Sequence, residues 1–218
     1  MSLVQRKPRP LARDRDSLRD DRLFIVACDD TYAPRQYFEF YRVPRVQVHV
    51  VPTIDGTSVA EHVLTRLLGF EHEDDDELWM VIDIDHCAQG NHIKSFLAAI
   101  TQARKSGVNI AVSKPCFELW LLLHHVEEAA VRGLSTAADV EAALRSQLGQ
   151  YNKANLRQKD FPLVSVAAAC MRARRLDQTV AGGEVPAENT SRVYQLWEAI
   201  AAKALPLQLP DELKGLCR

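Results

Sequence analysis

The sequence has no long apolar segment, no closely paired cysteines and almost no net charge. Its longest apolar run, residues 117–123, is interrupted by Glu118 and is far shorter than the ~20 residues of a membrane-spanning helix, so we expect no contact with a membrane. The five cysteines are widely separated and include no CxxC pair, which argues against a disulfide framework or a zinc knuckle. The Arg-rich N-terminus lacks the apolar segment of a secretory signal, so we expect a cytoplasmic protein. With a net charge of −2, any binding to nucleic acid must be local.

The hydrophobic pattern supports an α/β protein. Short apolar runs rich in β-branched residues predict strands at residues 23–28, 46–51, 78–84 and 108–112. Apolar residues at helical spacing predict helices at residues 37–41, 57–68, 92–105 and 115–126, the last opened by Pro115. Because strands that alternate with helices are joined by right-handed crossovers, we expect a mostly parallel sheet flanked by helices.

The last third of the sequence has a different pattern. Amphipathic helices are predicted at residues 136–150, 163–178 and 190–203, and no strand is predicted after Val112. We therefore expect a flexible basic arm at residues 1–22, an α/β core at 23–130 and a helical C-terminal region at 131–218 packed on that core. The arm is consistent both with a solubilising tail and with a nucleic-acid contact.

Two aspartates, Asp83 and Asp85, end the apolar run at residues 78–82. Residues i and i+2 of a strand point to the same face, so the two carboxylates should emerge side by side. Adjacent anions repel each other unless a cation lies between them, and Mg²⁺ favours carboxylate oxygens. The alternative is a pair of solvated turn aspartates, which are common after strands.

Other polar residues follow neighbouring strands of the predicted sheet. The first strand is followed by Asp29, and the fourth is followed by Ser113 and Lys114. Ligands of parallel sheets bind beyond the carboxyl ends of the strands, so Asp29, Asp83 and Asp85 are expected to form one pocket for Mg²⁺ or Mn²⁺. Lys114 is expected nearby, where its ammonium could balance the charge of a bound phosphate.

The segment at residues 113–124, SKPCFELWLLLH, is similar to the most distinctive motif of RloB-like proteins. Further matches in order and spacing are Asp83-x-Asp85, Tyr37-Phe38, Tyr151-Asn152-Lys153 and Asn189-Thr190-Ser191-Arg192-Val193-Tyr194. The resemblance extends over residues 22–200. It implies a protein encoded near bacterial restriction and phage-defence loci, with nucleic acid as a partner and a defence-system protein such as an ATPase as another.

RloB-like proteins are similar to the Toprim superfamily, and this similarity implies roles for the strand-end acids. In Toprim domains an acidic residue followed by Gly ends the first strand, and a DxD pair binds Mg²⁺; the corresponding residues here are Asp29-Asp30, and Asp83 with Asp85. Asp29 is one methylene shorter than the usual Glu, and Asp30 replaces the Gly. A strand pairing in the last third of the chain would count against the Toprim assignment.

Two functions of different classes follow from the resemblance. The first is a Mg²⁺-dependent Toprim-type nuclease that hydrolyses phosphodiester bonds of RNA or DNA in defence against phages. The retained Asp83 and Asp85 favour this hypothesis. The second is a catalytically degenerate sensor or adaptor that binds nucleic acid, a nucleotide or a partner protein. The departures at Asp29 and Asp30 favour this alternative.

The remaining candidate residues each have a structural and a functional interpretation. Glu118, within an apolar helix, is either a buried hydrogen-bonded residue or a member of the site. Tyr151 and Lys153 could stack on and neutralise a nucleotide, or be a packing tyrosine and an exposed lysine. Arg172 and Arg175 form either a nucleic-acid contact or a solvated helix face. His124 is expected to be a hydrogen-bonded core residue.

Overall fold

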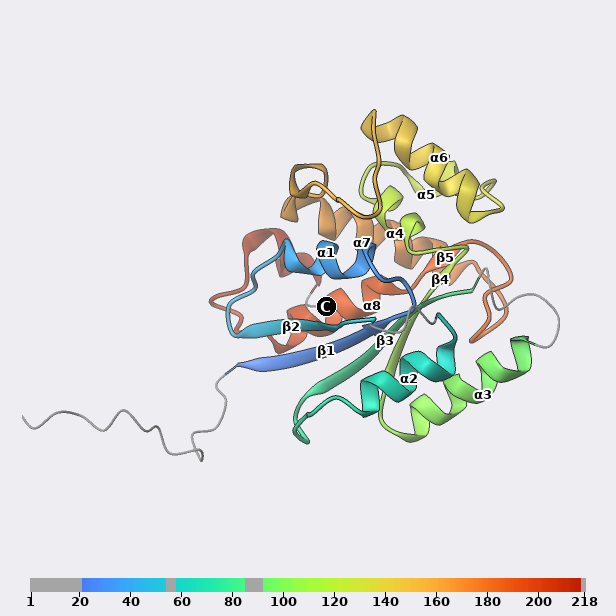
Figure 1. Cartoon of the computed structure of the whole chain (residues 1–218). Coiled ribbons are helices and arrows are strands. Elements are labelled where there is room, and N and C mark those ends of the chain that lie inside the picture. Colours follow the sequence, from blue (N-terminus) through green and yellow to red (C-terminus); the bar gives the residue numbers. More distant parts are fainter. Residues whose placement is uncertain (1–20, 54–57, 85–91, 217–218) are drawn as a thin grey trace, which may run out of the picture.

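The computed structural model describes residues 21–53, 58–84 and 92–216 and shows an α/β fold (Figure 1). Its five-stranded sheet has the order β2-β1-β3-β4-β5. The strands are β1 (Arg22–Cys28), β2 (Val46–Val51), β3 (Glu77–Asp83), β4 (Asn109–Lys114) and β5 (Thr190–Ser191). The first four are parallel, which confirms the predicted sheet and places the carboxyl ends of β1, β3 and β4 at one edge.

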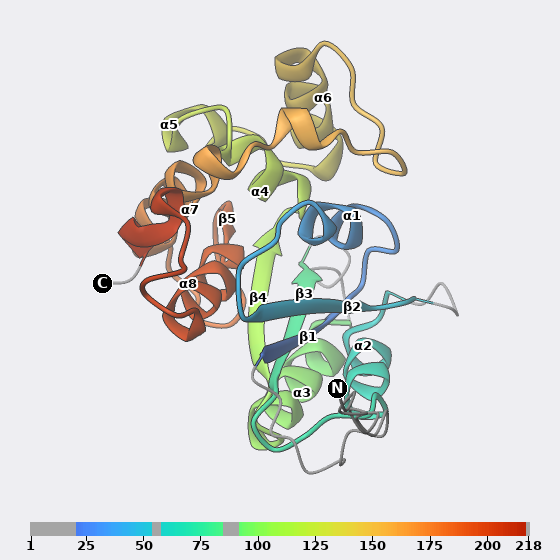
Figure 2. The same ribbon diagram turned by 90° about the vertical axis from the view of Figure 1, so that its left-hand side faces the viewer.

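Helices cover both faces of the sheet because alternate strand residues are apolar on both sides. Ile25 and Met80 pack beneath α2 (Ala60–Leu68) and α3 (His92–Lys105). Val26 and Val81 point the other way, into a larger core cluster. The helices on that side are α1 (Ala33–Glu39), α4 (Glu118–Leu123), α7 (Leu163–Gln178) and α8 (Val193–Lys203) (Figures 1 and 2).

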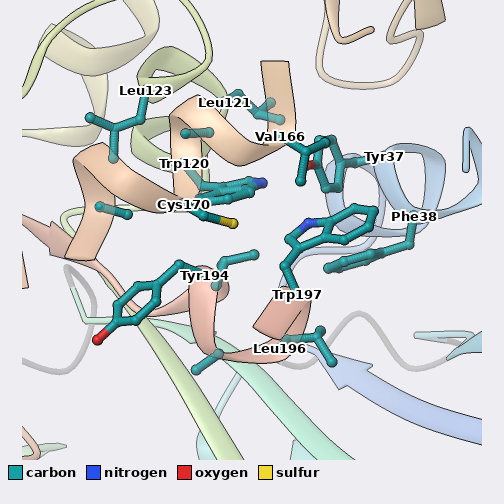
Figure 3. Close-up of a cluster of buried hydrophobic side chains, with 14 of the residues drawn as sticks. Tyr37, Phe38, Trp120, Leu121, Leu123, Val166, Cys170, Tyr194, Leu196 and Trp197 are labelled. Atoms are coloured by element: carbon teal, nitrogen blue, oxygen red, sulfur yellow. The ribbon is translucent and has the colours of Figure 1, made fainter. Parts of the chain in front are cut away.

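The larger core cluster joins the sheet to the C-terminal helices (Figure 3). Tyr37 of α1 meets Trp120 of α4 and Trp197 of α8 edge to face, with ring centroids 6.1 and 6.3 Å apart. All three side chains are at most 1% exposed. Helices beyond residue 130 therefore pack on the same core as the strands. On the outside of this layer lie α5 (Glu128–Val131), against α7, and α6 (Ala137–Leu148), against α4.

His124 is a satisfied core residue, as predicted. Its Nδ1 lies 2.7 Å from Oγ of Ser165, which donates to the carbonyl of Pro162, so Nδ1 carries the proton. Its Nε2 therefore accepts from Oη of Tyr37 at 3.0 Å. Burial lowers the pKa of His124 to about 3, so the ring is neutral and links α1, α4 and α7.

The prediction that no strand follows Val112 is wrong. Thr190 and Ser191 form β5, which pairs antiparallel with Lys114 and Ser113 of β4. Two residues are too few to produce an alternating hydrophobic pattern, and a buried hydrogen bond between the hydroxyls of Ser113 and Ser191, 3.0 Å, helps to hold them. This pairing counts against the Toprim assignment; the fold shown is α/β with a mostly parallel sheet.

Several predicted helices have different bounds in the structure; the helix expected at residues 190–203 begins at Val193, because Thr190 and Ser191 form β5. The helix expected at residues 37–41 begins at Ala33, because Pro34 is favoured in a first helical turn. The helix expected at residues 115–126 is shorter, and α4 begins at Glu118 after a turn in which the amide of Leu119 donates to the carbonyl of Cys116. Within the described residues, no helix has both the length and the apolar character needed to span a bilayer.

Candidate functional site

Asp29 and Asp83 meet at the carboxyl edge of β1 and β3. Cys28 pairs with Val81 in the parallel ladder, so the chain leaves β1 beside the last residues of β3. The Oδ2 atom of Asp29 accepts the amide of Asp83 at 2.7 Å, and Oδ1 accepts the amide of Asp30 at 2.9 Å. The structure thus brings together two of the three predicted carboxylates. The third, Asp85, lies outside the described residues.

The carboxyl group of Asp29 can change protonation near neutral pH. Burial and repulsion by Asp30 raise its pKa to about 7, although the amides of Asp83 and Asp30 favour the charged form. A carboxyl with this pKa can hold or release a proton under physiological conditions. Asp29 therefore has the properties of a general base as well as those of a metal ligand.

Asp30 connects this edge to a distant loop. Its Oδ1 accepts the amides of Tyr32 and Ala33 at 2.7 and 3.2 Å, which fixes the entry into α1. Its Oδ2 lies 2.5 Å from Nζ of Lys153. A glycine could make neither contact. The presence of Asp30 in place of the usual Gly therefore gives this chain an ion pair with Lys153, which the sequence alone did not predict.

Lys153, Glu118 and Tyr151 complete the polar network behind Asp30. The ammonium of Lys153 is 3.6 Å from Oε1 of Glu118, which is 1% exposed and also accepts from Oη of Tyr151 at 2.9 Å. Burial alone would lower the pKa of Lys153, but the attraction of Glu118 and Asp30 outweighs it and raises the pKa. Lys153 therefore stays protonated and positively charged at this site.

Gln36 of α1 positions the loop that carries Lys153. Its Nε2 donates to the carbonyl of Lys153 at 3.0 Å, and its Oε1 accepts the amide of Leu156 at 2.9 Å. These two bonds align the loop backbone with α1, whose entry Asp30 already fixes. Sequence reasoning identified Lys153 only as a general nucleic-acid contact, because nothing in the sequence links the loop to Gln36.

The network opens into a pocket of about 230 Å³. Its walls carry three carboxyl groups and the ammonium of Lys153, together with small polar side chains; the lining residues are Asp29, Asp30, Thr31, Tyr32, Ser58, Asp83 and Lys153. Glu118 lies behind Lys153. The pocket thus combines an acidic wall from two central strands with a cationic wall from a distant loop.

The carboxylate oxygens that line the pocket are suitable ligands for a hard divalent cation. The described residues contain no group of three or more His, Cys, Asp and Glu arranged to hold a metal. Mg²⁺, however, is commonly bound through one or two carboxylates, with water and phosphate oxygens in its other positions. Asp29 and Asp83 provide two carboxyl groups on adjacent strands, so the residues present fit such an ion.

The structure places the other predicted site residues away from the pocket. Nζ of Lys114 donates to the carbonyls of Pro186 and Ala187 at 2.9 and 2.8 Å and so holds the loop before β5. Arg172 pairs with Glu127 at 2.6 Å, and Arg175 lies 3.9 Å from Glu128. Among the described residues that line the pocket, the cation is Lys153, and Lys114 is not one of them.

The late motif at residues 189–194 forms a second polar cluster, which we call the Asp177 clasp. Its members are Asp177, Thr190, Arg192 and Tyr194. The two carboxylate oxygens of Asp177 accept from Nε of Arg192 at 3.0 Å, Oγ1 of Thr190 at 3.3 Å and Oη of Tyr194 at 3.0 Å. Nearby, Asn189 donates to the carbonyls of Val131 and Leu134. This motif ties α7 to β5 and α8 and lies outside the acidic pocket.

Comparison with known proteins gives one match. A family model described as RloB-like protein matches residues 24–200, a segment that includes every residue of the pocket and of the clasp. No curated protein and no solved structure matches this chain.

Proposed function

This chain belongs to the RloB-like protein family, and we propose that it is a Mg²⁺- or Mn²⁺-dependent nuclease that hydrolyses phosphodiester bonds in RNA or DNA. We further propose that it acts in the cytoplasm of bacteria in defence against phages, with a partner protein such as an ATPase. The observation that carries the proposed activity is the pocket at the carboxyl edge of β1 and β3, which is lined by the carboxyl groups of Asp29, Asp30 and Asp83 and by the ammonium of Lys153.

The charge balance of the pocket supports binding of a cation. Four carboxyl groups lie in or beside the pocket: Asp29, Asp30 and Asp83 line it together with Lys153, and Oε1 of Glu118 lies 3.6 Å from the ammonium of Lys153. Arg66 of α2 donates to the carbonyl of Cys28 at 2.9 Å, so a guanidinium also lies at this edge. Among the described residues at this edge, the carboxyl groups outnumber the cations Lys153 and Arg66. Like charges held this closely are relieved by binding a proton or a metal ion, and the raised pKa of Asp29 reflects this repulsion as well as burial.

Different residues of this chain can take different roles in phosphodiester hydrolysis. Asp83, with Asp85, would hold the metal ion, which would polarise the phosphoryl oxygen and lower the pKa of water. Asp29, with a pKa of about 7, can take the proton of the attacking water near neutral pH. Lys153, which lines the same pocket, can pair with a phosphate oxygen as a point charge. Glu118 and Tyr151 keep that lysine in place.

One observation favours the alternative, a sensor or adaptor without catalysis. Asp30 and Glu118 already have the ammonium of Lys153 as a partner, and both oxygens of Asp29 accept backbone amides. Such an internally satisfied site could bind a nucleotide or nucleic acid without cleaving it. The two functions differ in whether a divalent cation produces cleavage.

The experiment is a cleavage assay with the full chain on single- and double-stranded RNA and DNA, with Mg²⁺, Mn²⁺ or EDTA. We expect cleavage that requires the metal and is lost in Asp83→Asn. The matched control is Asp75→Asn, the same change before the amino end of β3, where Asp75 is exposed and pairs with Arg22. Absence of cleavage of every substrate with both metals would replace the nuclease with the binding function.

A further inference from the structure

A second cavity, of about 260 Å³, lies next to the loop that carries Lys153. It is formed by one continuous segment between α6 and α7. Its apolar wall is made by Leu148, Tyr151, Leu156 and Phe161, and its polar wall by Gln150, Asn152, Asn155, Arg157 and Asp160. Leu156 and Phe161 are buried, whereas the three amide residues are exposed. The cavity therefore has an apolar floor and a polar rim.

The polar rim has no net charge and is rich in side-chain amides that are available for hydrogen bonding. Nε of Arg157 donates to Oδ2 of Asp160 at 2.6 Å, so the cation and the anion of the rim are already paired. Among the described residues, the side-chain amides of Gln150 and Asn155 have no hydrogen-bond partner. Asn152 uses only Oδ1, which accepts the amide of Ala154 at 3.0 Å. Donors and acceptors are thus available together, without an excess of charge.

This chemistry fits a nucleobase better than a phosphate. A phosphate would meet the carboxylate of Asp160 and a guanidinium that is already paired. A nucleobase is planar and uncharged, packs on aromatic and apolar side chains, and presents donors and acceptors at its edge. Amide side chains can both donate to and accept from such an edge.

The cavity adjoins the acidic pocket through two residues of the same loop. Tyr151 lines the cavity while its hydroxyl donates to Glu118, and Lys153, two residues later, reaches Asp30. We propose that this cavity is a nucleobase subsite that binds a base of a single-stranded nucleic acid beside the phosphate held at the acidic pocket. A paired base would not expose its edge, so the substrate class is a single strand or a flipped-out nucleotide. The identity of the ligand as a nucleic acid rests on the proposed function. The test of the subsite measures binding and needs no cleavage.

The experiment measures binding of short, fluorescently labelled single-stranded RNA and DNA to the full chain with Ca²⁺ in place of Mg²⁺, because a phosphate at the acidic pocket needs a cation and Ca²⁺ also takes oxygen ligands. Wild type is compared with the double variant Gln150→Ala, Asn155→Ala. The matched control is Gln147→Ala, an exposed residue of α6 that does not line the cavity. We expect the double variant to bind at least about tenfold more weakly and the control to bind like wild type. Circular dichroism checks that all three proteins are folded.

A second arm replaces the oligonucleotide by one of the same length with abasic nucleotides. Wild type should bind the abasic strand about as weakly as the double variant binds the normal strand. The proposal is overturned if wild type binds both strands equally, if the double variant keeps full affinity, or if neither strand binds. Base-dependent binding without cleavage in any metal would support the subsite and reject the nuclease, so the two failures are distinguishable.

Discussion

The acidic pocket and the Asp177 clasp are built from the same kinds of side chain but differ in charge balance. The clasp has one carboxylate, that of Asp177, which faces the guanidinium of Arg192 and two hydroxyls. The pocket has several carboxyl groups around Lys153, and burial together with repulsion raises the pKa of one of them, Asp29, to about 7. The pocket joins elements that are far apart in the sequence, whereas the clasp joins the consecutive elements α7, β5 and α8.

The difference indicates which cluster serves the fold and which serves a ligand. A balanced cluster is complete within the chain, so removing one member leaves a partner uncompensated. A cluster with excess negative charge gains from a further cation, so removing one carboxylate relieves repulsion. Substitutions at the two sites should therefore change stability in opposite directions and activity at only one of them.

The largest expected effect is the loss of cleavage in Asp83→Ala. If Asp83 holds the metal ion, the Mg²⁺-dependent rate should fall by about 10³-fold or more, and the same loss is expected for Asp85→Ala. The free energy of unfolding should stay unchanged or rise slightly, because a like-charge repulsion is removed. Cleavage assays and urea denaturation of the same preparations measure both quantities. A folded Asp83→Ala protein with full metal-dependent activity would remove the pocket from the mechanism.

The next effect is expected at the clasp, in Asp177→Ala. This change leaves the guanidinium of Arg192, whose side chain is 16% exposed, without its carboxylate. We expect the free energy of unfolding to fall by about 3 kcal/mol and Tm to fall by roughly 10 °C, while folded protein keeps its activity. Asp75→Ala, at an exposed pair, is the control and should change stability by less than about 0.5 kcal/mol. Equal losses in the two variants would show that the clasp has no structural role.

Asp29 should make stability depend on pH near neutrality. Its folded-state pKa of about 7 lies above the usual value of 3.8, so the folded protein keeps this proton while the unfolded chain releases it. The contribution is fully present below pH 3.8, and it is lost as pH rises to about 7. Between pH 5 and pH 8 we expect a loss of roughly 2.6 kcal/mol that is absent in Asp29→Asn.

The measurement for Asp29 is urea denaturation of both proteins across this pH range. The difference between their slopes reports on Asp29, because the other titrating groups are common to both proteins. Parallel pH profiles would mean that the carboxyl of Asp29 is ionised in the folded protein throughout the range. In that case its role as a proton acceptor near neutral pH would be lost.

The sequence predicted the meeting of Asp29 and Asp83 for a physical reason. Continuous apolar runs identify buried parallel strands, and the carboxyl ends of neighbouring strands share one edge. The position of Lys153 could not be predicted in this way, because its loop is placed by Gln36, a residue far away in the sequence. Lys114 was expected at the pocket on the strand-end rule, but its long side chain turns to the carbonyls of Pro186 and Ala187.

The clasp shows the same limit. The sequence motif at residues 189–194 was recognisable, but its purpose depends on Asp177, which the sequence pattern assigns only to a helix. Strand β5 was missed because two residues carry no periodicity. Local patterns thus predict elements and strand ends, whereas polar networks between distant segments need the packed structure.

A smaller effect is expected when Mg²⁺ is added. An ion that binds only the folded protein stabilises it by about 1.4 kcal/mol at a concentration ten times Kd. The gain in Tm should be larger at pH 8 than at pH 6, because at the lower pH a proton competes for Asp29. Thermal unfolding with and without Mg²⁺ measures this gain, which should vanish in Asp83→Asn. Retention of the full gain in Asp83→Asn would place the ion elsewhere.

The smallest effect separates an exposed arginine from the arginine of the clasp. Arg175 has a side chain that is 54% exposed, and its pairing with Glu128 is long, at 3.9 Å, so Arg175→Ala should change stability by less than about 0.5 kcal/mol. If Arg175 contacts a phosphate, which is one of the two interpretations of the sequence, the variant should bind nucleic acid slightly more weakly, with a salt dependence reduced by about one ion. Arg192→Ala should instead lower stability and leave that salt dependence unchanged, because Asp177 holds its guanidinium. Binding titrations at several salt concentrations measure the slopes. An unchanged slope in Arg175→Ala would show that Arg175 makes no phosphate contact and belongs to a solvated helix face.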